Sequence, residues 1–77
     1  MKYRVDSIAL RKLMIDNGYD TITDLERACG VSRNTLSGII NETIRPSTNV
    51  MDKLANALNM DQRTAGDVFF APDLRNA

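Results

Sequence analysis

One side of a short predicted helix, residues 33–41, carries side chains that can hydrogen-bond to nucleic acid. At 100° per residue, one arc of this helix holds five polar or small residues: Arg33, Asn34, Ser37, Gly38 and Asn41. A guanidinium, two amides and a hydroxyl can bond base edges and phosphate oxygens. The opposite arc is aliphatic and predicts burial of Leu36, Ile39 and Ile40. DNA binding is therefore the leading hypothesis, and a solvated helix face is the alternative.

The residues before this segment predict a tight turn between two helices. Gly30 can adopt the positive φ angle that ends one helix, and Ser32 can cap the next. Thr21 can cap the preceding helix in the same way. Two helices joined by so short a turn form a helix-turn-helix.

The whole chain predicts five helices and no strands. We expect the helices at about residues 7–17, 22–29, 33–41, 47–58 and 62–69. Ala71-Pro72 is expected to end the last helix, and the tail over 71–77 is expected to be frayed. The expected fold is all-α: a compact five-helix bundle that forms a single domain over residues 1–77 and contains the helix-turn-helix.

The composition lacks the groups that most catalytic and metal sites require. The chain has 77 residues, one cysteine and no histidine, so Cys29 cannot form an internal disulfide and a zinc site is not expected. There is no nucleophile–base pair and no glycine-rich phosphate loop. The sequence thus predicts a protein that is not an enzyme, with no metal, no cofactor and no small-molecule substrate.

The charges balance overall but are segregated along the chain. Formal net charge is zero, with +3 over residues 1–12, +2 over residues 27–50 and only acidic charged residues over 13–26. DNA affinity is therefore expected to depend on helix N-termini and on dimerisation as well as on side-chain charge. With no apolar run of membrane-spanning length and no signal-peptide core, we expect no membrane contact and a cytoplasmic location.

Several short sequence elements lie at characteristic spacings along most of the chain. They are Leu25 with Gly30, Val31-Ser32-Arg33, Ser37, Asn41, Pro46-Ser47, and Leu54-Ala55 followed by Leu58. In this order, over roughly residues 8–60, they resemble the Cro/C1-type (XRE) helix-turn-helix family of small phage and bacterial transcriptional regulators. The resemblance implies that the third helix enters the major groove. It also implies a homodimer on a two-fold operator in double-stranded DNA.

The resemblance assigns roles to individual residues. Arg33 and Asn34 would read base edges, the first as a fork onto guanine and the second as a partner of adenine. Ser37 and Gly38 would complete the surface that faces the bases. Four further residues would lie near phosphates: Thr21, Ser32, Asn41 and Arg45.

Three features depart from the family pattern. Gly38 lies where many members carry a second base-reading side chain. Glu26 lies where the family usually has alanine, so its carboxylate must tilt outward or find a partner, and it would repel phosphate. Met14 and Ile40 replace a buried Arg–Glu ion pair, which well-packed apolar groups can do without loss of stability.

A second apolar face suggests a protein partner. Val5, Ile8 and Ile15 lie roughly opposite the inward stripe of the helix at 7–17, and Phe69 and Phe70 add apolar surface near the C-terminus. These five residues could bind another repressor protein or a second copy of the chain, or the last helix could cover them. Two functions follow: a DNA-binding transcriptional regulator, or an antirepressor that binds another repressor protein through an apolar or acidic surface, with or without binding DNA.

Overall fold

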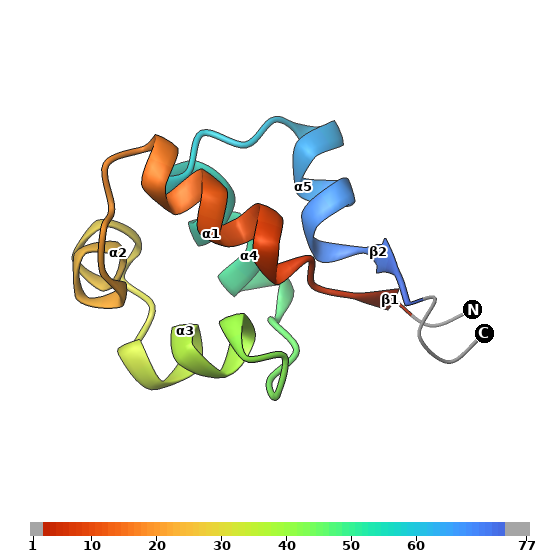
Figure 1. The fold of residues 1–77 in the computed structure, drawn as a ribbon, viewed down its shortest axis with the longest axis horizontal. Coiled ribbons are helices and arrows are strands. Elements are labelled where there is room, and N and C mark those ends of the chain that lie inside the picture. The colour runs from red at the N-terminus through yellow and green to blue at the C-terminus, as the bar shows by residue number, and fades with distance from the viewer. Residues whose placement is uncertain (1–2, 74–77) are drawn as a thin grey trace.

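The computed structural model describes residues 3–73 and confirms the predicted five-helix bundle (Figure 1). The elements in chain order are β1 (Tyr3–Arg4), α1 (Ser7–Asp16), α2 (Ile22–Cys29), α3 (Arg33–Ile40), α4 (Thr48–Ala57), α5 (Gln62–Phe69) and β2 (Ala71–Pro72). Each helix end lies within one residue of its predicted position. In Figure 1, α3 lies along one edge of the molecule and α5 at the opposite edge.

Each helix begins at a side chain that caps its first turn. The five caps accept a hydrogen bond from the backbone N–H three residues further on: Asp6, Thr21, Ser32, Ser47 and Asp61. Such a bond satisfies one of the N–H groups that has no partner within the helix. The backbone N–H of Thr64 and then its side chain hold the pKa of Asp61 below its ordinary value of 3.8. Because folding lowers this pKa, the cap stabilises the fold above that value and loses its effect as pH falls through the folded-state pKa.

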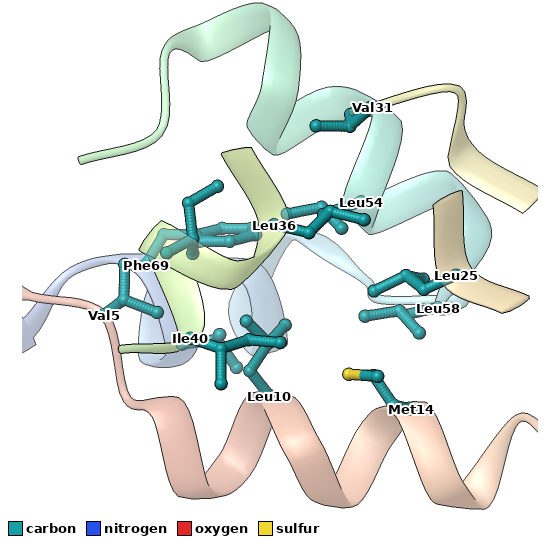
Figure 2. Close-up of a cluster of buried hydrophobic side chains, with 12 residues drawn as sticks. Val5, Leu10, Met14, Leu25, Val31, Leu36, Ile40, Leu54, Leu58 and Phe69 are labelled. Atoms are coloured by element: carbon teal, nitrogen blue, oxygen red, sulfur yellow. The ribbon is translucent and has the colours of Figure 1, made fainter. Parts of the chain in front are cut away.

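Twelve buried apolar residues form one core to which every helix contributes (Figure 2). The largest fully buried side chains are Leu10, Leu25, Leu36, Ile39, Leu54 and Leu58. Within residues 3–73, no polar or charged residue is buried. Stability therefore comes from aliphatic packing, and the polar groups of the capped helices stay at the surface.

The two short strands correct the expectation of an all-helical chain. Tyr3 pairs with Pro72 and Arg4 with Ala71 in an antiparallel ladder. The Asp6 N–H also donates to the Val68 carbonyl at 2.7 Å, which ties the start of α1 to α5. Residues 71–73 are therefore ordered against the N-terminal segment and not frayed, and 74–77 lie outside the described residues. Strands of two residues are too short to show the alternation that identifies strands in sequence.

The same pairing divides the predicted partner surface. Val5 and Phe69 are buried in the core, with 7% and 4% of their surfaces exposed, so these two assignments were wrong. Val5 follows β1 directly and is held against α5, next to Phe69 (Figure 2). Ile8, Ile15 and Phe70 are exposed as predicted, at 79%, 65% and 52%.

Asn17 joins the C-terminal ends of α1 and α4. Its Nδ2 donates to the carbonyl of Leu13 at 2.8 Å and to that of Leu58 at 3.1 Å. Its Oδ1 accepts a hydrogen bond from Asn59 Nδ2 at 2.8 Å. Asn59 is left-handed, with φ of 54°. One half-buried amide thus satisfies carbonyls at two helix ends.

We expect Asn17→Ala to lower the free energy of unfolding by about 1–2 kcal/mol, because the Leu58 carbonyl loses its side-chain donor and the Asn59 amide loses its acceptor. For a domain of this size the change corresponds to a drop in melting temperature of roughly 4–8 °C per kcal/mol. Thermal unfolding followed by circular dichroism measures it. Asn56→Ala, at an exposed position of α4, is the matched control and should change stability by less than about 0.5 kcal/mol. Equal losses in the two variants would contradict the role given to Asn17.

Candidate nucleic-acid interface

The aliphatic arc of α3 is buried, which directs its polar arc to solvent. Leu36 and Ile39 are fully buried and Ile40 is 6% exposed, as predicted. Arg33 and Asn34 are exposed at the start of the helix. Within residues 3–73, neither of these two side chains has a hydrogen bond or ion pair. A guanidinium and an amide are thus presented outward at the N-terminal end of α3, free to bond an external group.

The turn between α2 and α3 has the predicted geometry. Gly30 is left-handed, with φ of 74°, and Val31 is 5% exposed and anchors the turn to the core. Ser32 Oγ accepts a hydrogen bond from the Thr35 N–H at 3.3 Å and donates to Thr35 Oγ1 at 2.9 Å. The position of Arg33 relative to α2 is therefore set by a left-handed glycine, a buried valine and a capping serine.

Glu26 has a partner on α3. Its Oε2 accepts a hydrogen bond from the backbone N–H of Arg33 at 2.8 Å. The carboxylate therefore satisfies an N–H at the positive end of the α3 dipole, where a negative charge is stabilising. Of the two expectations for this carboxylate, an outward tilt or a partner, the structure shows a partner. The carboxylate also places a negative charge where the family pattern has alanine.

Gly38 does not present an open position on the polar arc, and its assignment as a base-facing residue was wrong. It is buried beneath the side chain of Ile44. A Cβ built on Gly38 would overlap Ile44 Cδ1 and lie 2.6 Å from Cγ1. The Gly38 carbonyl accepts the N–H groups of Thr43 and Ile44, at 2.8 and 3.1 Å. Sequence spacing could not reveal this contact, because Ile44 comes from the loop beyond α3.

The loop after α3 is also fastened to the N-terminal strand. Arg45 Nη2 donates to the Tyr3 carbonyl at 2.6 Å, and Arg4 Nη1 pairs with Glu42 Oε1 at 3.1 Å. Glu42 itself is left-handed, with φ of 63°. Sequence reasoning missed these bonds, since nothing in the local pattern links residues about 40 positions apart. Arg45 remains exposed, so its guanidinium edge lies at the surface beside α3.

The remaining predicted phosphate contacts lie at exposed helix ends. Thr21 Oγ1 accepts the Asp24 N–H at 3.1 Å, and Asn41 Nδ2 donates to Ser37 Oγ at 3.4 Å. Thr21, Ser32 and Asn41 are exposed, whereas Ser37 is half-buried. The hydroxyls of Thr21 and Ser32 cap their own helices; that of Thr21 can still donate to an external acceptor, whereas that of Ser32 already donates to Thr35 Oγ1.

Apolar packing joins α1 to α3. Met14 and Ile40 are each 6% exposed and belong to the same core, as expected for residues that replace an ion pair (Figure 2).

Within residues 3–73, no cluster of histidine, cysteine, aspartate or glutamate could hold a metal ion. The described helices are each too short or too polar to cross a membrane.

We expect Glu26→Ala to lower the free energy of unfolding by about 1 kcal/mol, because the Arg33 N–H loses its acceptor. Glu26→Gln should cost less than half as much, since an amide oxygen can still accept the bond. Chemical denaturation gives both values. The control is Asp20→Ala, which removes an exposed carboxylate outside the helices. If Glu26→Ala lowers the free energy of unfolding no more than this control does, the bond to Arg33 does not stabilise α3.

The comparison with protein families agrees with this geometry. The family model of the Cro/C1-type helix-turn-helix DNA-binding domain matches residues 9–63. Searches of the curated proteins and of the solved structures find no match. The matched range includes α2, the turn at Gly30 and α3 complete. Since it covers well over half of the 77 residues, the chain belongs to the Cro/C1-type helix-turn-helix DNA-binding domain family.

Proposed function

We propose that this protein is a sequence-specific transcriptional regulator of phage or bacterial repressor type, which reads the major groove with residues 33–41. The observation that carries the proposal is the pair Arg33 and Asn34, exposed and unengaged at the start of a helix whose opposite side is fixed in the core. Recognition helices of this motif contact bases with their N-terminal residues. The protein would act on DNA in the bacterial cytoplasm.

Each polar group has a distinct task in this proposal. Arg33 forks onto O6 and N7 of guanine, and the Asn34 amide pairs with N6 and N7 of adenine. Ser37, half-buried on the same arc, offers a hydroxyl to the nearest base or phosphate. The phosphate contacts come from Thr21, Ser32, Asn41 and Arg45, all of which are exposed.

A homodimer suits a chain with no net positive charge. Its net charge is zero, so one copy gains little affinity from counterion release. Two copies on a two-fold operator would place their α3 helices in successive major grooves, about 34 Å apart. Binding two half-sites through one dimer compensates for the few phosphate contacts that each half-site makes.

Selection from random duplexes, followed by footprinting, tests the proposal. We expect enrichment of a two-fold sequence that contains guanine and adenine in each half-site. The affinity for this sequence should fall as salt concentration rises. Enrichment of no sequence at micromolar protein would overturn the proposal.

One observation favours a second candidate function, an antirepressor that binds another repressor protein. Ile8 and Ile15 are 79% and 65% exposed on α1 and lie one heptad apart, on one face of the helix. Size-exclusion chromatography with repressor proteins encoded by neighbouring genes tests this function. A complex that Ile15→Asp abolishes would support it, and separate elution from every such protein would exclude it.

We expect Arg33→Ala to relax sequence preference at one base pair of each half-site, with a loss of discrimination of about 1–3 kcal/mol. Arg45→Ala is the matched comparison, because it removes an equal charge from the phosphate surface. This second variant should weaken binding to all sequences alike and reduce the salt slope by about 1. Fluorescence anisotropy with operator and single-base variants measures both effects. If Arg33→Ala weakens all sequences equally, Arg33 contacts phosphate and not a base.

A further inference from the structure

The side chain of Ile44 occupies the place of a missing side chain on the recognition helix. A Cβ on Gly38 would overlap Ile44 Cδ1, and Ile44 Cβ would lie 3.1 Å from it. Ile44 therefore fills the volume that a residue at position 38 would otherwise fill. Gly38 lies on the polar arc, about 40° around the helix from Asn34 and about 6 Å further along its axis.

The backbone holds Ile44 in this position. Three hydrogen bonds end on the Gly38 carbonyl, from the Thr43 N–H, the Ile44 N–H and the Thr43 hydroxyl at 2.8, 3.1 and 3.2 Å. On either side, Glu42 is left-handed and Arg45 is bonded to the Tyr3 carbonyl. The three bonds to Gly38 attach the loop to α3 and the bond from Arg45 attaches it to β1, so the backbone is fixed on both sides of Ile44.

Although it packs on Gly38, Ile44 remains 42% exposed. Asn34, Asn41 and Arg45 are polar and exposed, so Ile44 supplies apolar surface among polar groups. In the major groove the chemical partner for an aliphatic side chain is the C5-methyl group of thymine. Apolar contact with that methyl group distinguishes thymine from cytosine without any hydrogen bond.

We propose that Ile44 is a specificity-determining residue that packs against a thymine methyl group, next to the base pair read by Asn34. This inference rests on the proposed function, since it requires α3 to lie in the major groove. It explains how a recognition helix with glycine at position 38 retains contact at that point. The polar arc supplies hydrogen bonds to bases, and the loop supplies the apolar contact.

Deoxyuridine tests the proposal directly, because it differs from thymidine only by the missing methyl group. In the selected operator, each thymine of the half-site is replaced in turn by deoxyuridine, and binding is measured by fluorescence anisotropy. With the unaltered protein, we expect one position to lose affinity by about fourfold per half-site, the change that corresponds to one buried methyl group. If the protein binds the operator specifically but no thymine position responds, this inference is wrong and the proposed function stands.

Variants then assign the effect to Ile44. With Ile44→Ala, the thymidine and deoxyuridine operators should bind equally well, so that the fourfold difference disappears. Asn56→Ala, which truncates an exposed side chain on α4, should retain the full difference. An unchanged difference in Ile44→Ala, or its loss in Asn56→Ala, would overturn the inference.

Two further results keep the test decisive. Ile44→Val removes only the δ-methyl group and keeps Cγ1 and Cβ over Gly38, so it serves if the alanine variant fails to fold. It should reduce the difference without abolishing it, and no reduction in this folded variant would overturn the inference. If the unaltered protein selects no DNA sequence at all, both the proposed function and this inference are excluded.

Discussion

Burial of one side of α3 is the constraint on which the rest of the structure depends. Leu36, Ile39 and Ile40 hold this helix by aliphatic packing, and within residues 3–73 the core contains no polar side chain that could fix its orientation by hydrogen bonds. Rotation about the helix axis would expose these three residues and bury Asn34 without a partner, which is costly in both respects. The outward direction of Arg33 and Asn34 is thus a consequence of the core.

A small domain has few contacts to spare, and here the paired segments at Tyr3–Arg4 and Ala71–Pro72 help to hold the surface around α3. The strand pair at Tyr3 and Pro72 places the N-terminal segment beside the loop after α3. Arg45 and Glu42 of that loop bond to Tyr3 and Arg4. The segment after α5, which the sequence predicts to be a frayed tail, therefore pairs with the strand that supports the loop carrying Ile44. Because short loops at a surface are mobile unless tied down, these bonds preserve the shape of the α3 surface.

Local chemistry determined what could be predicted from the sequence. Helix ends were predicted to within one residue because caps such as Ser32 and Asp61 act over three residues. The burial of Val5 and Phe69 and the covering of Gly38 could not be predicted in this way. Each depends on a contact between segments whose pairing leaves no periodic signal: two-residue strands in the first case and a loop folded onto a helix in the second. The roles of individual residues toward DNA stay predictions.

The use of charge at this surface indicates how selectivity can arise without strong electrostatic attraction. The carboxylate of Glu26 accepts a hydrogen bond from the first turn of α3, and Arg4 pairs with Glu42. Arg33 remains unengaged, but the chain as a whole is neutral. Non-specific binding depends almost entirely on phosphate neutralisation, whereas base recognition depends on hydrogen bonds and apolar contact. Under the proposed function, the lack of net positive charge would lower the affinity for random DNA more than the affinity for an operator, and would so increase the ratio between the two affinities.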